Sequence, residues 1–224
     1  MNTVTVISAG LSIPSTTRQI ADAVSQRVEA AVSARGESVK IQNIELRGYV
    51  NDIAQVFTTG FSSERLDEIK TQVSESDGLI VVTPVFKASY SGLFKMFFDA
   101  LDTEALNGMP TIIAATAGTA RHSLVTEYAM RPLFTYMRAV VVPTSLFAAT
   151  EDFGGEEGKA FEQRASRAAG ELADLIVSQN SAVGGLGGAT AEGQGTHRRR
   201  KAGVDLEEDM VPFAELLKDH DGNG

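Results

Sequence analysis

Hydrophobic and polar residues alternate with two different periods along residues 1–180. Short apolar or β-branched runs recur along the chain. Each is followed by a longer stretch in which apolar residues return every three or four positions. The short runs predict strands, and the longer stretches predict amphipathic helices. The pattern therefore predicts a chain in which strands and helices alternate, in the order βαβαβαβαβα.

The predicted elements can be placed by residue number. The expected strands are residues 3–8, 37–44, 78–85, 110–116 and 139–147, and the expected helices are residues 15–35, 62–76, 91–101, 119–138 and 155–178. Pro84 is expected to stop the third strand, and the segment that holds Gly48, Asn51, Asp52 and Gly60 is expected to be a loop. Because the third and fourth strand runs are apolar throughout, they are typical of strands buried on both faces. The order predicts an α/β fold with a doubly wound, five-stranded parallel sheet and helices on both faces.

The last part of the chain has a different composition. Of the 21 glycines, seven fall between residues 184 and 203, in a stretch without aromatic residues. A basic cluster over residues 197–201 and a short acidic amphipathic piece over residues 204–220 follow. Such a stretch buries too little apolar surface to offset its ordering entropy. The sequence predicts one domain over residues 1–180 and a flexible tail over residues 181–224.

Composition and charge exclude several kinds of protein. The 224 residues carry a net charge of −9 and include no cysteine, which excludes disulfides, zinc–thiolate sites, iron–sulfur clusters and thiol nucleophiles. The acidic balance argues against broad nucleic-acid binding. No apolar run approaches the roughly 20 residues that span a bilayer, and the N-terminal residues lack the pattern of a signal peptide. We expect a cytoplasmic protein with no metal site, no nucleic-acid partner and no membrane partner.

In an open parallel sheet, ligands bind at the carboxyl ends of the strands, so the loops after the strands are the places to search. The first such loop and the start of its helix carry four hydroxyls and one guanidinium, from Ser12, Ser15, Thr16, Thr17 and Arg18. Hydroxyls and free N–H groups at a helix N-terminus favour an anion. The loop lacks both GxxxxGK[ST] and GxGxxG, so a single phosphate monoester fits better than a pyrophosphate. The alternative is a helix cap without a ligand.

Two further loops are rich in small residues. Residues 83–95 place Ser89, Ser91 and Gly92 next to Phe86 and Tyr90, which suits the edge of a flat ring. After the fourth strand, the small residues Ala117, Gly118 and Thr119 again expose backbone polar groups. The alternative for both is an ordinary loop, with two core aromatics in the first. His122 has no acidic partner nearby in the sequence, so we interpret it as structural or as an interface residue.

Three segments in this order and spacing, ISAGLSIPSTTRQIA, TPVFKASYSGLFKMFFDAL and ATAGTARHSLVTEYAMRPLF, carry a family likeness. They resemble the NADPH-dependent FMN reductases, flavodoxin-like enzymes that supply two-component monooxygenases. The likeness covers roughly residues 3–150 and extends loosely to residue 180. TPVFKASYSG is its most specific motif. The C-terminal tail departs from the family pattern, which leaves the tail's role open.

The resemblance assigns roles by position. It implies that the first loop holds the FMN phosphate through Ser12, Ser15, Thr17 and Arg18, with Thr16 contributing backbone. It implies that Pro84, Val85, Phe86 and Lys87 pass along the isoalloxazine ring, with Tyr90, Ser91 and Gly92 nearby, and that Ala117, Gly118 and Thr119 meet the polar edge of the ring. In part of the family a tyrosine at the position of Tyr128 lies over the flavin at a subunit interface; the alternative is a half-buried core tyrosine.

The function implied is the transfer of a hydride from NADPH or NADH to FMN. This reaction requires no catalytic side chain of the protein, because the cofactors carry it. A flavin-dependent monooxygenase is the implied partner, and a homodimer or homotetramer is the implied assembly. Three alternatives stay open: a quinone, azo or chromate reductase on the same fold, a flavodoxin-like electron carrier, and a binding module that has lost its cofactor. The absence of tryptophan favours the reductase over the carrier, which usually sandwiches its flavin between aromatic rings.

Overall fold

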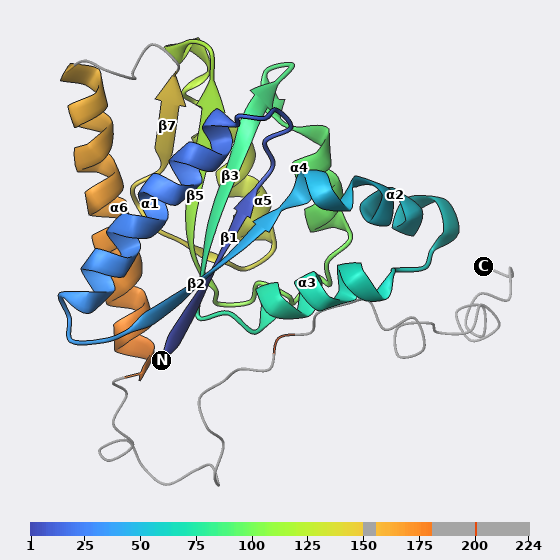
Figure 1. Cartoon of the computed structure of the whole chain (residues 1–224), viewed down its shortest axis with the longest axis horizontal. Coiled ribbons are helices and arrows are strands. Elements are labelled where there is room, and N and C mark those ends of the chain that lie inside the picture. Colours follow the sequence, from blue (N-terminus) through green and yellow to red (C-terminus); the bar gives the residue numbers. More distant parts are fainter. Residues whose placement is uncertain (150–155, 181–199, 201–224) are drawn as a thin grey trace, which may run out of the picture.

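The computed structural model of the chain describes residues 1–149, 156–180 and 200. Its centre is a twisted sheet whose main strands are parallel (Figure 1). These are β1 (Asn2–Ser8), β2 (Val39–Glu45), β3 (Gly78–Phe86), β5 (Pro110–Ala117), β6 (Val140–Val141) and β7 (Leu146–Ala149). The strand order is β2-β1-β3-β5-β6, with β7 also paired to β5. This is the flavodoxin-like order, so the fold class predicted from the sequence is confirmed.

Helices cover both faces of the sheet (Figure 1). One face packs against α1 (Thr16–Ser33) and α6 (Glu156–Asn180), and the other packs against α2 (Val50–Thr59), α3 (Glu64–Ser74), α4 (Gly92–Asp99) and α5 (Arg131–Tyr136). Each layer has its own apolar core. Alanines of α6 such as Ala165 and Ala169 fill the first, whereas the second contains the rings of Phe94, Phe98 and Phe134.

The prediction of a loop after the second strand is wrong, because most of that segment is helical. A 3₁₀ turn, η1 (Leu46–Tyr49), leads directly into α2, which ends at Gly60. Gly60 has a φ of 77°, the left-handed conformation that commonly terminates helices. Leu46 and Ile53 are fully buried, so tertiary packing outweighs the turn-forming residues on which the loop prediction depended.

The prediction of a single helix over residues 119–138 is also wrong. The segment forms a 3₁₀ turn, η2 (Ala120–His122), a π-helical turn, η3 (Thr126–Met130), and the short helix α5. Pro132 lies in the first turn of α5 and has no N–H to donate back into the preceding turn. An α-helix cannot run through this proline with all its hydrogen bonds, so the ladder changes register before it.

The extents of two strands differ from the prediction, and each difference involves a proline. Pro84 does not stop β3, which continues to Phe86 and folds back as the antiparallel strand β4 (Ser89–Tyr90). Pro84 is paired in register with Thr116 near the end of the β3–β5 ladder, where a missing donor is tolerated. The expected fifth strand is split into β6 and β7, with Pro143 between them.

The predicted tail lies outside the described residues apart from Arg200, so neither the domain boundary at residue 180 nor the flexibility of the tail is tested. In the described part of the chain, none of the helices has both the length and the hydropathy needed to cross a membrane.

Candidate cofactor site at the carboxyl edge of the sheet

A cavity of about 340 Å³ lies where β1, β3 and β5 end. Its volume is within the range of small-molecule sites, roughly 300–1,000 Å³. The lining comes from three segments, one after each of these strands or at its end: Gly10, Leu11, Ser12, Thr16 and Thr17 from the first, Pro84, Val85 and Phe86 from the second, and Thr116, Ala117 and Gly118 from the third. The three loops that the sequence predicted to carry chemistry therefore meet at one cavity.

The first loop wraps tightly around the N-terminus of α1. Ser15 is the N-cap, and its Oγ accepts a hydrogen bond from the N–H of Arg18 at 3.2 Å. A Cβ on Gly10 would lie 2.1 Å from that Oγ, so only glycine fits here without a shift. Among the described residues, the N–H groups of Thr16 and Thr17 have no acceptor, and the first turn holds no acidic residue. Two free donors at a helix N-terminus favour an anion at this end of the cavity.

A buried hydrogen bond joins the first loop to the third. The Oγ1 atoms of Thr17 and Thr116 are 3.0 Å apart, and the two residues are only 4% and 5% exposed. Thr116 stands near the end of β5, next to the cavity-lining Ala117 and Gly118. The bond thus connects the end of the cavity where an anion is expected with the strand end expected to meet a ring.

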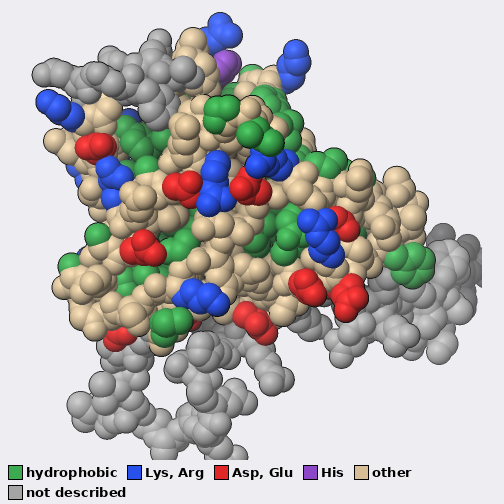
Figure 2. Space-filling view, viewed as in Figure 1, with side chains coloured by type: hydrophobic (Ala, Val, Ile, Leu, Met, Phe, Trp, Pro, Cys, Tyr) green, Lys and Arg blue, Asp and Glu red, His purple; other side chains and the backbone are tan. Residues whose placement is uncertain are grey.

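Arg18 does not line the cavity, although the family resemblance assigns it to the phosphate. Its guanidinium is 2.7 Å from Asp22 and 2.9 Å from Glu45. Glu45 also binds Arg47 at 2.8 Å, and Arg47 donates to the Ser12 carbonyl at 3.3 Å. Acidic and basic side chains alternate across the middle of the face shown in Figure 2. Because two carboxylates neutralise Arg18, the charge at this edge is balanced, and Arg47 instead anchors the first loop.

The second loop is a tight hairpin between β3 and β4. Its two turn residues, Lys87 and Ala88, have φ values of 50° and 68°. Two successive left-handed residues match the twist of a hairpin, although glycine or asparagine is the usual choice. Val85 and Phe86 enter the cavity lining, whereas Lys87 lies in the exposed turn.

The remaining residues of the second loop support it from behind. Tyr90 packs on Phe94 with ring centroids 5.8 Å apart. Ser91 is buried, caps α4 through the Phe94 N–H at 3.2 Å and donates its own N–H to the Thr83 Oγ1 at 3.1 Å. Gly92 begins α4. None of Tyr90, Ser91 and Gly92 is among the residues that line the cavity.

The third loop contributes its first residues only. Ala117 and Gly118 line the cavity, whereas Thr119 does not. His122 ends the 3₁₀ turn η2, and its Nε2 accepts a hydrogen bond from the Arg121 Nε at 3.1 Å. Tyr128 is on the π-helical turn η3 and is 79% exposed, so the alternative of a half-buried core tyrosine is wrong.

An ion pair holds the π-helical turn in place. Arg131 donates to both carboxylate oxygens of Glu127, at 2.6 and 3.0 Å, and to the carbonyls of Val142 and Pro143. The hydrogen bonds from Arg131 hold the pKa of Glu127 below its ordinary value of 4.5.

The lowered pKa predicts a pH dependence of stability. A carboxyl whose pKa is depressed by folding stabilises the fold above its unfolded pKa, and the contribution is lost as the pH falls through the folded value. We expect the stability difference between wild type and Glu127→Gln to be constant above pH 4.5 and to shrink as the pH falls below it. Urea unfolding at a series of pH values measures this difference. A gap that stays constant through the acid range would contradict the assignment.

The structure brings eight of the fifteen predicted site residues to the cavity: Ser12, Thr16, Thr17, Pro84, Val85, Phe86, Ala117 and Gly118. It adds Gly10, Leu11 and Thr116, which the sequence analysis did not single out as site residues. A signal for Gly10 existed, since it is the one glycine in the turn after the first strand. No such signal marks Thr116, because a threonine at the end of a buried strand is also typical of an ordinary sheet.

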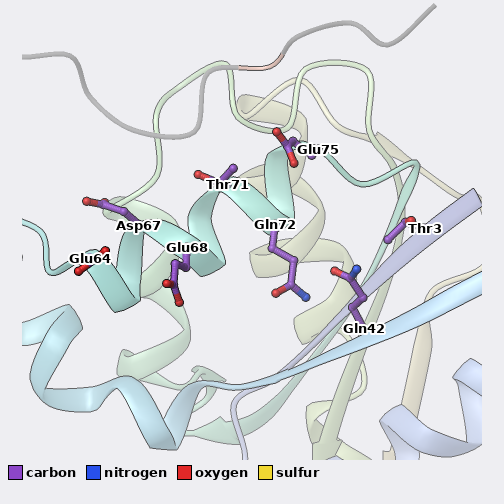
Figure 3. Close-up of a pocket in the computed structure, with 8 residues that line it drawn as sticks. All are labelled: Thr3, Gln42, Glu64, Asp67, Glu68, Thr71, Gln72 and Glu75. Carbon is purple, nitrogen blue, oxygen red and sulfur yellow. The ribbon is translucent and has the colours of Figure 1, made fainter.

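A second, larger cavity of about 660 Å³ lies between α3 and the edge strand β2 (Figure 3). Its lining combines carboxylates with amides and hydroxyls: Glu64, Asp67, Glu68 and Glu75, together with Thr3, Gln42, Thr71 and Gln72. None of these residues follows the carboxyl end of a strand, so this cavity is separate from the candidate cofactor site.

Comparison with known proteins gives a consistent result. The sequence profile of the NADPH-dependent FMN reductase family matches residues 2–154. The chain is 32% identical over 150 residues to an NADH-dependent FMN reductase, SfnF, of Pseudomonas putida, an alignment that covers 67% of this chain and 78% of that protein. It is 32% identical over 152 residues to an FMN reductase (NADPH) of Pseudomonas aeruginosa, with the same coverage of 67% and 78%.

A solved structure is more similar still. An oxidoreductase from Corynebacterium diphtheriae is 66% identical, with a TM-score of 0.78 over 80% of this chain and 98% of that one.

Proposed function

The chain belongs to the NADPH-dependent FMN reductase family, and we propose that it reduces FMN with NADPH or NADH at the cavity on the carboxyl edge of the sheet. The observation that supports this placement most strongly is the pair of N–H groups at Thr16 and Thr17, which have no partner among the described residues and would donate to an anion bound at the N-terminus of α1. The neighbouring hydroxyl of Ser12 adds a further polar group at this end of the cavity.

The cavity residues fit FMN. Ser12, Thr16 and Thr17 would hold the phosphate, Pro84, Val85 and Phe86 would lie along the ring, and Ala117 and Gly118 would offer backbone groups to its polar edge. The small side chains and the glycines at the strand ends leave room for a flat ring. Bound FMN supplies the redox chemistry, the acceptance of a hydride from nicotinamide.

Among the described residues, those that line the cavity carry no acidic, basic or histidine side chain. The contribution of the chain is therefore to bind and orient the two rings at near-attack distance, about 3–3.5 Å. Of the lining residues that the structure describes, Phe86 is the one aromatic residue. This leaves a ring face uncovered for nicotinamide and favours a reductase over an electron carrier that encloses its flavin between aromatic rings.

The reaction can be tested by mixing the purified protein with FMN and reduced nicotinamide without oxygen. We expect the flavin absorbance to bleach with NADPH, with NADH or with both. A parallel steady-state assay that compares free FMN with a quinone as acceptor distinguishes an FMN reductase from a quinone reductase on the same fold. No bleaching with either nucleotide would contradict the proposal.

Reduced FMN has to leave the protein if it serves a partner, which we propose is a flavin-dependent monooxygenase in the cytoplasm. The described residues of the lining include no Lys or Arg, which supports modest phosphate binding and hence release. Stopped-flow measurement of FMN dissociation tests this proposal. Dissociation slower than turnover would favour a tightly bound prosthetic flavin.

We also propose a homodimer or homotetramer. Five large apolar side chains at or after the carboxyl ends of β1, β3 and β5 are between 45% and 83% exposed: Leu11, Ile13, Phe86, Leu124 and Tyr128. Apolar groups gathered on one edge of a molecule are typical of an interface. Light scattering on the purified protein measures the assembly, and a monomer at all concentrations would contradict it.

The threonine pair at the cavity predicts a change in FMN affinity. Thr116→Val keeps the shape of the side chain but leaves the buried Thr17 hydroxyl without its partner. We expect the KM for FMN to rise about five- to ten-fold with kcat unchanged, and Thr116→Ser to restore it. Steady-state kinetics with varied FMN measures both constants.

A matched control exists elsewhere in the sheet. Thr5 is buried and shares a hydrogen bond of 2.6 Å with the Ser76 hydroxyl, away from the cavity. Thr5→Val removes the same kind of bond without touching the proposed site. If both variants raise the KM for FMN equally, the effect of Thr116 is general destabilisation rather than positioning of Thr17.

A further inference from the structure

The guanidinium of Arg200 is seated on the domain, although the residue follows α6 by twenty positions. Its Nε donates to the Asn107 carbonyl at 2.9 Å. Its NH1 group donates to the carbonyl of Ser76 at 2.7 Å and to that of Ser74 at 3.2 Å. Three backbone carbonyls from two separate segments thus converge on one arginine.

These carbonyls are at a place where a cation is needed. Ser74 ends α3, so its oxygen belongs to the carbonyls that a helix leaves unpaired at its C-terminus, and Ser76 follows just after the C-cap Glu75. The first turn of α3 carries Glu64 and Asp67, but its last turn carries no basic residue. A cation at the C-terminal end of a helix complements its dipole. Arg200 therefore supplies from a distant part of the chain the charge that α3 lacks.

The face of α3 next to this point is acidic. The cavity shown in Figure 3 is lined by four carboxylates, and no Lys or Arg lines it in the part of the chain that the structure describes. Of the four, Asp67 pairs with Lys70, whereas Glu64, Glu68 and Glu75 form no ion pair with a described residue. The sequence neighbours of Arg200, Arg198, Arg199 and Lys201, are all basic. The charge of the helix face therefore complements that of the segment to which Arg200 belongs.

We propose that the C-terminal end of α3 and the turn before β5 form a docking site for the chain's own basic segment, residues 197–201, with Arg200 as its anchor. The acidic face of α3 attracts the segment, and the three carbonyls fix Arg200. Ser76 and Asn107 precede β3 and β5, so this docking site lies at the amino ends of the strands, opposite the candidate cofactor cavity. A partner recruited by the C-terminal part of the chain would leave that cavity accessible.

Amide hydrogen exchange on the full-length protein tests the proposal. In Arg200→Ala we expect the amides of Glu75, Ser76 and Asn107 to exchange roughly ten- to a hundred-fold faster, as the loss of about one net hydrogen bond to a charged donor predicts. Arg199→Ala is the matched control, because it removes the same charge one position away. We expect it to change exchange in both segments much less than Arg200→Ala does, because it weakens the attraction to the acidic face but leaves the three carbonyl hydrogen bonds of Arg200 in place.

Two further measurements separate the anchor from its alternatives. Arg200→Lys keeps the charge but not the planar fork that reaches several carbonyls, so it should give intermediate exchange. If Arg200 docks on its own chain, exchange of these amides should not change when the protein is diluted. If a second copy supplies the arginine, the amides should lose protection on dilution. Equal effects of Arg199→Ala and Arg200→Ala, wild-type exchange in Arg200→Ala, or protection that falls on dilution would each overturn the proposal.

Discussion

Gly10→Ala is expected to weaken FMN binding on the order of 10²-fold, the effect of displacing a binding group by about 1 Å. The new Cβ would lie 2.1 Å from the Ser15 Oγ and 3.0 Å from the Thr17 Cβ. Ser15 has to give up its cap or the loop has to move, and either change displaces the free N–H groups of Thr16 and Thr17. We also expect a loss of about 1–3 kcal/mol in unfolding free energy, as in other overpacked sites. Flavin fluorescence titration measures the first effect and urea unfolding the second.

Gly78→Ala is the matched control for this variant. Its Cβ would lie 2.8 Å from the Ile176 Cδ1 and 3.3 Å from the Val4 Cγ2, at the start of β3 and away from the cavity. It should lower stability without changing the FMN affinity of the folded protein. If Gly10→Ala binds FMN as tightly as Gly78→Ala, the first loop does not hold the phosphate.

Phe94→Ala is expected to lower the unfolding free energy by about 3–5 kcal/mol, a large part of the stability of a typical domain. Phe94 is fully buried, and its ring lies 4.7 Å from that of Phe98 and 6.1 Å from that of Phe134. It therefore ties α4 to α5, and it also supports Tyr90 behind the second loop. Truncation would leave a cavity at the centre of this cluster. Urea unfolding measures the loss.

The exposed Phe61 provides the comparison for Phe94. It is 70% exposed, so Phe61→Ala removes a ring of the same size from the surface. We expect its unfolding free energy to stay within about 0.5 kcal/mol of wild type. A similar loss in the two variants would mean that the aromatic cluster does not hold the second helical layer together.

The parallel sheet and its helices follow from the sequence because their signals are local. The apolar run over residues 78–85 and the amphipathic period of residues 15–35 each occur within one element. The same locality explains the failures. Residues 45–61 contain turn formers, and only the burial of Leu46 and Ile53 against other elements makes the segment helical. Pro132 interrupts an otherwise helical pattern, but that pattern does not indicate that a π-helical turn forms before the proline.

The candidate site divides in the same way. That three loops meet at one edge follows from the topology of a parallel sheet, and the loops did meet at one cavity. Which side chains of each loop enter the cavity depends on contacts between distant residues. Glu45 and Asp22 hold Arg18 outside it, and β5 brings Thr116 to Thr17. Of these three contacts, the spacing of the sequence indicates only the i,i+4 pair of Arg18 and Asp22, because the other two join residues far apart in the chain.

The central claim is that this chain passes hydride from a reduced nicotinamide to FMN that it binds at the carboxyl edge of its sheet. The most direct measurement is the steady-state oxidation of NADPH and of NADH by the full-length protein as free FMN is added. We expect oxidation that rises with FMN and saturates, at a higher FMN concentration in Gly10→Ala and at the wild-type concentration in Gly78→Ala. Oxidation that does not depend on added FMN with either nucleotide would contradict the claim.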